Sequence, residues 1–150
     1  MTTVAPRPLK VLLVEDSEED VMVIRLALNE RIDDHELVVI GNGDAAIAYL
    51  QAEPPHSGRP LPDLVLLDLN LPGTDGHGVL QAIKSNKTLH ATPVVIMTTS
   101  GSEGDINAAY ALNANAYVQK PIHVDEFMSA VRSVKAFWVA HVRFPEREDL

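Results

Sequence analysis

Short apolar runs alternate along the chain with longer segments in which apolar residues recur every three or four positions. The apolar runs carry many β-branched residues and no regular polar alternation, which is typical of strands buried on both faces. The longer segments have the apolar stripe of helices that pack on one side. Strands are predicted at residues 9–14, 36–40, 63–67, 92–99 and 116–119. Helices are predicted at residues 17–31, 43–52, 75–86, 102–113 and 124–142.

Five strand–helix units in succession predict a doubly wound α/β fold, with a five-stranded parallel sheet and five helices. Right-handed crossovers place helices on both faces of such a sheet. The first helix begins after Ser17, a good N-cap, and three acidic residues follow beside the positive end of its dipole. Residues 53–62 are rich in proline and glycine, which indicates a surface loop.

The length of 150 residues suits one domain, and we expect a single domain over residues 1–150, with its core at about 9–142 and a polar tail at 144–150. Cysteine is absent, which excludes disulfides and thiolate metal sites. The N-terminus lacks the apolar stretch of a signal peptide, and no apolar run approaches the ~20 residues that span a bilayer. We therefore expect a cytoplasmic protein that makes no membrane contact.

Acidic residues outnumber basic ones, and the formal net charge is -9. No basic stripe is visible, and a negative surface repels phosphate backbones. We therefore expect no binding to nucleic acid. Most of the acidic residues are interpreted as solvated surface, so the informative question is whether some of them converge.

Polar side chains follow four of the predicted strands. Asp68 ends an apolar run, and a charge at the edge of a core is costly unless it is paired or holds a metal. The carboxyl ends of parallel strands share one edge of an open sheet, where ligands bind. The residues predicted at this edge are Glu15, Asp16, Asp68, Asn70, Thr98, Thr99, Ser100 and Lys120.

Two or three carboxylates crowded at one edge repel each other, and a divalent cation neutralises them. Carboxylate oxygens together with several waters suit Mg²⁺. Lys120 adds a positive charge and Thr98 a hydroxyl. A metal, a cation and a hydroxyl around Asp68 make a phosphoryl-transfer site, in which this carboxylate attacks phosphorus and forms an acyl phosphate.

Each of these residues alone has a simpler interpretation. Asp16 alone is as easily a helix cap as a ligand, although Ser17 is the better cap. Lys120 alone is a surface lysine, and Thr98 alone is a strand residue. Their occurrence together, in this order and on one edge, favours the phosphoryl-transfer site.

The motifs that carry these residues resemble the receiver domain of two-component response regulators, from about residue 9 to residue 142. The acidic pair is Glu15-Asp16, and the phosphoacceptor position is Asp68 in "LLDLNLPGTDG". The hydroxyl position is Thr98 in "VVIMTTS", and the lysine is Lys120 in "YVQKP". The resemblance implies a flavodoxin-like receiver fold and transfer of a phosphoryl group from a sensor histidine kinase to Asp68.

The resemblance also implies a role for each residue around the phosphoacceptor. Mg²⁺ would be held by the carboxylates of Glu15, Asp16 and Asp68 and by the backbone carbonyl of Asn70. Thr98 would move toward the phosphoryl group, and Tyr117 occupies the aromatic switch position, although an amphipathic aromatic at the sheet edge is its plainer interpretation. The positions expected to set the lifetime of the phosphate are Asn70, Thr99 and Ser100.

A finer resemblance is to the single-domain regulators that partner bacterial phytochromes. It rests on "LLDLNLPGTDGHGVL", "PVVIMTTS", the proline-rich insertion and the pair Phe137-Trp138. Only eight residues follow Val142, so we expect no output domain, and the output would be a protein contact or onward phosphate transfer. Phe137, Trp138 and Val142 near the end of the last helix are expected to form a homodimer interface, with local packing under the tail as the alternative.

Three functions remain to be distinguished. The first is a signalling module controlled by phosphorylation of Asp68, which accepts and slowly loses phosphate without being a turnover enzyme. The second is a phosphohydrolase with an aspartyl nucleophile, against which Asn70 stands in the place of the general acid found in such enzymes. The third is a protein interaction module that needs no phosphate, against which the intact set of Asp68, Thr98 and Lys120 argues.

Overall fold

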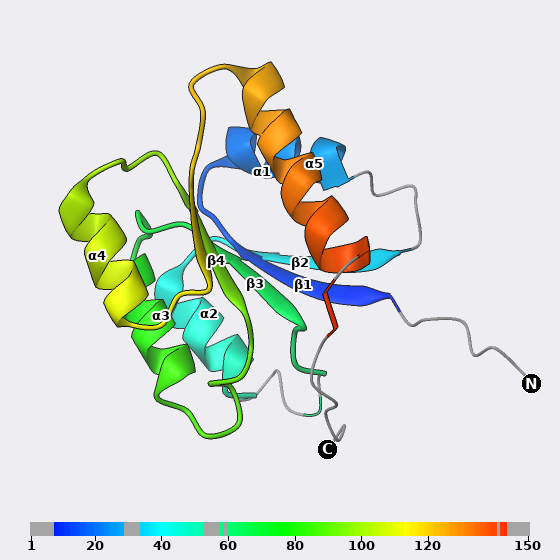
Figure 1. Ribbon diagram of the computed structural model, residues 1–150. Coiled ribbons are helices and arrows are strands. Elements are labelled where there is room, and N and C mark those ends of the chain that lie inside the picture. Colours follow the sequence, from blue (N-terminus) through cyan, green and yellow to red (C-terminus); the bar gives the residue numbers. More distant parts are fainter. Residues whose placement is uncertain (1–7, 29–33, 53–57, 59, 141, 144–150) are drawn as a thin grey trace, which may run out of the picture.

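The computed structural model describes residues 8–28, 34–52, 58, 60–140, 142 and 143 (Figure 1). The strands are β1 (Leu9–Val14), β2 (His35–Ile40), β3 (Leu64–Leu67), β4 (Val94–Thr98) and β5 (Ala116–Gln119). The helices are α1 (Glu18–Leu28), α2 (Gly43–Leu50), α3 (Gly76–Lys84), α4 (Glu103–Ala111) and α5 (Val124–Ala140). The tail at 144–150, the end of the first predicted helix and most of the proline-rich loop lie outside the described residues.

The five strands form one parallel sheet in the order β2-β1-β3-β4-β5. Helices α1 and α5 pack together on one face, and α2, α3 and α4 cover the other (Figure 1). The predicted doubly wound α/β fold is therefore confirmed. From β1 the chain runs to β2 on one side and then returns to β3 on the other side of β1. The strand order therefore reverses between β1 and β3. Folds of this type bind ligands at such a point.

Alternate residues of each central strand point to opposite faces of the sheet, because side chains alternate along a strand. Leu12, Val65 and Ile96 belong to the core on the α2–α4 side. Leu13 and Met97 belong to the core on the α1–α5 side. All these side chains are at most 1% exposed. Two buried faces explain why the strands read as continuous apolar runs.

The observed helices are shorter than the predicted ones because the predicted ranges included capping residues. The side chain of Asp75 accepts a hydrogen bond from the N–H of Gly78, and that of Ser102 accepts one from the N–H of Asp105, so both are N-caps outside the helices. At the other end, Ala52 and Asn113 have φ angles of 55° and 69°, which a continuing helix does not allow. The fourth strand is likewise confined to Val94–Thr98, inside the predicted range 92–99.

The first and last helices are joined where α1 ends. Ser17 caps the start of α1, as predicted, because its Oγ accepts the N–H of Asp20 at 3.2 Å. At the other end, Lys135 Nζ of α5 donates to the carbonyl oxygen of Leu28 at 2.5 Å and pairs with Asp34 at 3.1 Å. This lysine satisfies a carbonyl that the end of a helix leaves without a partner.

Candidate phosphoryl-transfer site

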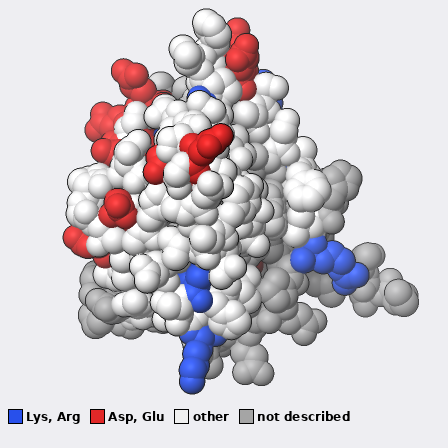
Figure 2. Space-filling view, turned by 60° about the vertical axis from the view of Figure 1, so that its left-hand side comes forward, with Lys and Arg blue, Asp and Glu red and all other residues white. Residues whose placement is uncertain are grey.

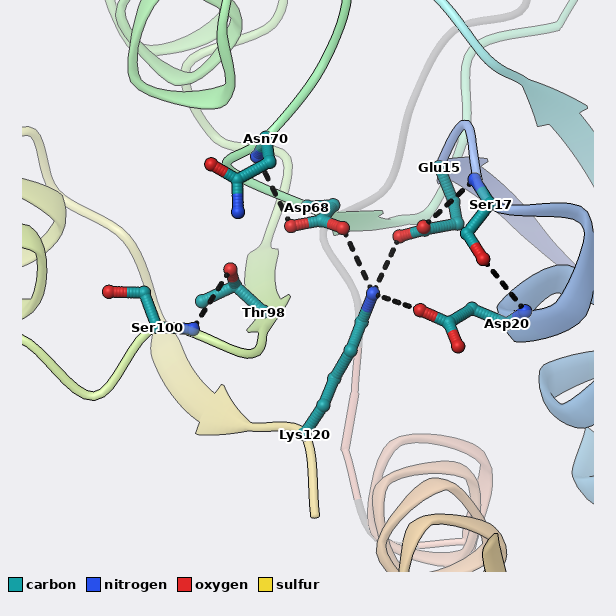
Figure 3. A network of polar contacts seen from close by, with 8 residues as sticks. All are labelled: Glu15, Ser17, Asp20, Asp68, Asn70, Thr98, Ser100 and Lys120. Carbon is teal, nitrogen blue, oxygen red and sulfur yellow. Dashed lines mark hydrogen bonds and ion pairs between the residues drawn. The ribbon is translucent and has the colours of Figure 1, made fainter. Parts of the chain in front are cut away.

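Backbone hydrogen bonds continue one residue past β1, β3 and β5 and so fix the residues that follow these strands. The N–H of Glu15 donates to the carbonyl of Ile40 at 3.1 Å, and the N–H of Asp68 donates to that of Val14 at 3.0 Å. The N–H of Lys120 donates to the carbonyl of Thr98 at 2.6 Å. The first residue after each of these strands is thus held in the direction of its strand, at one edge of the sheet (Figure 3).

Two glycines allow backbone segments to pack directly beneath this edge. A Cβ on Gly76, at the start of α3, would overlap the carbonyl oxygen of Asp68. A Cβ on Gly43, at the start of α2, would overlap the carbonyl group of Thr74. The loop that carries Asp68 is therefore supported by the backbones of two helix starts.

The carboxylates of Glu15, Asp16 and Asp68 form a cluster whose oxygen atoms lie within 4.8 Å of one another. Glu15 is 3% exposed and Asp68 is 7% exposed, whereas Asp16 faces solvent. Hard oxygen ligands with one open side are the donors that Mg²⁺ prefers, because this ion retains several waters. The residues present thus fit a divalent cation, with Asn70 two positions beyond Asp68.

The ammonium group of Lys120 donates to three carboxylates. Its Nζ lies 2.9 Å from Glu15 Oε2, 2.9 Å from Asp68 Oδ2 and 2.7 Å from Asp20 Oδ2 (Figure 3). A lysine has three N–H donors, so all of them are used. Burial alone would lower the pKa of Lys120, but hydrogen bonds to Asp20, Glu15 and Asp68 outweigh it and raise this pKa above its ordinary value.

Sequence reasoning did not find Asp20 as part of this site. The prediction considered only residues that follow strands, and Asp20 lies in the first turn of α1. Its position there has a sufficient explanation in the helix dipole. No pattern in the sequence indicates that its side chain pairs with Lys120, the residue that follows β5.

The pKa values of Glu15 and Asp68 are shifted in opposite directions. Burial, together with the hydrogen bond to Asp68, raises the pKa of Glu15 to about 8, although Lys120 acts against this. Burial would also raise the pKa of Asp68, but hydrogen bonds from Glu15, Lys120 and the backbone of Asn70 hold it below its ordinary value. Two neighbouring carboxyl groups share one proton more easily than they both ionise. These opposite shifts favour the ionised form of Asp68 over that of Glu15.

The opposite side of the site is built from the segment after β4. Thr98 is fully buried at the end of the strand beside Asp68, and its Oγ1 accepts the N–H of Ser100 at 3.4 Å. The hydroxyl of Tyr117 donates to the carbonyl of Ser100 at 2.8 Å. The hydroxyl of Ser100 donates to Asp105 Oδ2 at 2.5 Å. Tyr117 and α4 are thus both tied to the segment that carries the buried threonine.

The residues expected to tune the site lie at its rim. Asn70 is exposed, and its N–H donates to Asp68 Oδ1 at 3.2 Å. Thr99 is exposed, and its carbonyl accepts a hydrogen bond from Gln119 Nε2 at 3.3 Å. A cleft beside the acidic cluster is lined in part by Asp16, Asn70 and His77. On the face shown in Figure 2, acidic side chains gather mainly in the upper half, while most of the visible basic surface lies in the lower half.

The residues expected to form a dimer interface differ in exposure. Phe137 is 55% exposed, and its ring meets that of Trp138 edge-on, with centroids 5.9 Å apart. Trp138 is half-buried against the core on the α1–α5 side, and Val142 is half-buried too. Phe137 is therefore the member of the predicted set that offers a large apolar surface to solvent. Within the described residues, no helix combines the length and the apolar character needed to cross a membrane.

The sequence matches the family described as the response regulator receiver domain over residues 11–132. The chain therefore belongs to this family. It is 41% identical over 138 residues to the response regulator Rcp1 of Synechocystis sp., which covers 92% of this chain and 94% of that protein. It is 38% identical to the probable methanogenesis regulatory protein FilR2 of Methanothrix harundinacea, over 94% of this chain and 90% of that protein.

Solved structures of receiver proteins share the fold. The phosphorylated cyanobacterial phytochrome response regulator RcpA is 39% identical, with a TM-score of 0.90 over 93% of this chain and 99% of that one. The Mn²⁺-bound form of Rcp1 is 40% identical, with a TM-score of 0.89 over 93% of this chain and 100% of that one. The predicted family, its flavodoxin-like fold and the resemblance to phytochrome-associated regulators are confirmed.

Proposed function

We propose that this protein is a signalling domain that accepts a phosphoryl group on Asp68 from a sensor histidine kinase. The observation that carries the proposal is the state of this carboxylate. Asp68 is buried at the sheet edge, its pKa is held below its ordinary value, and its Oδ2 is held by Lys120 and its Oδ1 by the N–H of Asn70. A desolvated, oriented carboxylate beside a cation is a nucleophile prepared for phosphorus.

In the proposed step, an oxygen of Asp68 supplies an electron pair to phosphorus. The bond from phosphorus to the donor atom breaks at the same time, and the donor, an imidazole nitrogen in a histidine kinase, keeps the bonding pair. Lys120 and the hydroxyl of Thr98 stabilise the charge on the transferred oxygens. The product is an acyl phosphate on Asp68, which water slowly hydrolyses.

We propose Mg²⁺ as the cofactor, held by Glu15, Asp16 and Asp68 with the backbone carbonyl of Asn70. Support comes from the spacing of the three carboxylates and from the manganese in the Rcp1 structure. When bound, the ion would neutralise charge that otherwise repels the incoming phosphoryl group. Receiver domains are not in general turnover enzymes, and we propose the same for this chain.

We propose a bacterial phytochrome with histidine kinase activity as the partner, because the similar protein RcpA is a cyanobacterial phytochrome response regulator. The protein would act in the cytoplasm as a single receiver domain. Its output would be a protein contact, most simply a homodimer that buries Phe137, Trp138 and Val142. In this proposal, the charge added at Asp68 draws Thr98 inward and shifts the segment tied to Tyr117, and the shift biases the interface.

The proposal is tested by intact mass after incubation with acetyl phosphate and Mg²⁺. We expect the wild type to gain one phosphoryl group and Asp68→Asn to gain none. Asp125→Asn is a matched control, because it makes the same change at an exposed carboxylate on α5. A folded wild-type protein that gains no phosphate would instead support the phosphate-independent interaction module. Sustained release of phosphate from phosphate esters would support the phosphohydrolase.

A further inference from the structure

Of the three carboxylates that pair with Lys120, that of Asp20 is the closest, with 2.7 Å between its Oδ2 and the lysine Nζ. The other two partners, Glu15 and Asp68, belong to the acidic cluster that fits a divalent cation. Asp20 is outside that cluster and comes from a helix rather than from a strand end. It therefore holds the ammonium from outside the group of carboxylates that would hold the cation.

The position of Asp20 is fixed by the start of α1. Its N–H donates to Ser17 Oγ, and the N–H of Ser17 donates to Glu15 Oε1 at 3.1 Å. The same turn thus orients both Glu15 and Asp20 toward the lysine (Figure 3). The side chain of Asp20 is 28% exposed, compared with 2% for Glu15 and 8% for Asp68. Asp20 is the solvent-side partner of an otherwise buried ammonium group.

The two buried partners are both committed elsewhere during phosphoryl transfer. Asp68 gives up its negative charge when it becomes an acyl phosphate, and Glu15 is needed for the cation. We propose that Asp20 is a positioning residue that keeps the Lys120 ammonium in place while those two carboxylates change partners. This inference rests on the proposed function and adds to it a residue whose partner is the lysine, not the phosphate or the metal.

The covalent step is the one already described, with acetyl phosphate as the donor. An electron pair of an Asp68 oxygen forms the new bond to phosphorus, and the acetate oxygen keeps the pair of the bond that breaks. Asp20 does not exchange a proton or a bond in this step. Its loss leaves one N–H of Lys120 without its carboxylate, so the ammonium is drawn toward Glu15 and away from the arriving oxygens.

The first experiment compares the rates at which wild type, Asp20→Asn and Glu19→Gln gain phosphate, measured by intact mass with acetyl phosphate and Mg²⁺. Glu19 is a matched control, because it is an exposed carboxylate in the same first turn of α1. We expect Asp20→Asn to be slower by about tenfold and Glu19→Gln to match the wild type. Asp20→Glu, which keeps the charge, is expected to recover most of the rate.

The second experiment is independent of phosphate and metal. The ¹H–¹⁵N signal of the Lys120 ammonium is expected in the metal-free wild type, because all three protons are held, and in Glu19→Gln. It should broaden in Asp20→Asn. This readout separates loss of the anchor from a change elsewhere in the site.

An Asp20→Asn protein that gains phosphate at the wild-type rate, or faster, overturns the inference, and so does an unchanged ammonium signal. If Asp20→Asn does not fold, the rate of Asp20→Glu is the test instead. This variant keeps the negative charge, so a tenfold slower gain of phosphate would contradict anchoring of the lysine by the carboxylate. A wild type that gains no phosphate removes the proposed function itself. That result is distinct from a phosphorylated wild type with an equally active Asp20→Asn.

Discussion

Two lysines lie at opposite ends of the sheet, and each is held by three oxygen atoms. Lys84, at the end of α3, donates to the carbonyls of His90 and Thr92 and to the side-chain oxygen of Asn115, at 3.3, 2.8 and 3.1 Å. Lys120, at the carboxyl end, donates to three carboxylates. The two ammonium groups have the same number of partners and differ in the charge of those partners.

This difference in charge separates a structural contact from a functional one. Neutral partners do not offset the burial of Lys84, and burial lowers its pKa. Lys120 pairs with three carboxyl groups, and Asp16 lies in the same acidic cluster, so negative charge remains in excess around this one ammonium group. A partly buried lysine with three hydrogen-bond acceptors therefore does not by itself identify a site. An excess of carboxylates beside the lysine does identify one, because a cation can neutralise their charge.

The largest expected effect is on phosphoryl transfer. Lys120→Met is expected to slow the gain of phosphate from acetyl phosphate by about a thousandfold, because a preorganised positive charge on the transferred oxygens is lost. Lys84→Met is the matched change at the other end of the sheet and should stay within about twofold of wild type. Intact-mass time courses give both rates. If the two variants were slowed equally, the charge of the partners would not distinguish a functional lysine from a structural one.

The next effect is on stability and depends on the cation. Mg²⁺ at about a hundred times its dissociation constant is expected to raise the free energy of unfolding by about 2.7 kcal/mol, which corresponds to a rise in Tm of about 5 to 10 °C. Lys84→Met should show the same rise, and Asp16→Asn should lose most of it. Calorimetry with and without Mg²⁺ tests this, and an identical rise in Asp16→Asn would exclude Asp16 as a ligand.

A smaller effect is the structural contribution of Lys84. Lys84→Met is expected to lower the free energy of unfolding by about 1–2 kcal/mol, because the carbonyl of Thr92 and the side chain of Asn115 each lose a hydrogen bond. Urea unfolding without metal measures the change. A variant as stable as the wild type would indicate that the lysine is not a structural tie between α3 and the starts of β4 and β5.

The smallest effect is a dependence on alkaline pH. The pKa of Lys84 is lowered from 10.5 in the folded protein, so the folded state releases this proton at lower pH than the unfolded chain. The folded state then binds fewer protons, and the stability of the wild type relative to Lys84→Met rises with pH as 10.5 is approached from below. Urea unfolding of both proteins at increasing alkaline pH measures this difference. A falling difference would contradict the assigned direction.

The sequence was sufficient for the fold because each central strand is buried on both faces. Runs such as 63–67 carry this signal without reference to any other segment, so every strand was predicted in place. The ends of helices were less accurate because Asp75 and Ser102 act as caps, and periodicity does not separate a cap from the first residue of a helix. Ser17 was recognised as a cap from its residue type and position, whereas the hydrogen bonds of the Asp75 and Ser102 side chains were needed to identify these two caps.

The candidate site was predictable to the extent that it depends on strand order. Glu15, Asp68 and Lys120 each follow a strand, so a parallel sheet alone brings them to one edge. Asp20 was missed because its contact with Lys120 depends on the turn of α1 around Ser17 and spans 100 residues of sequence. The roles of Asn70, Thr99, Ser100 and Tyr117 remain predictions, since the contacts of these residues are now known but their effects on phosphate are not.

The glycines under the site have a consequence for genetics. Gly43 and Gly76 have no side chain to contribute to chemistry, yet any larger residue there would overlap the backbone that supports Asp68. Missense substitutions at these two codons should therefore produce loss-of-signalling alleles without changing any charged residue. An inventory of natural variants that scores only the catalytic motif would classify such alleles as harmless.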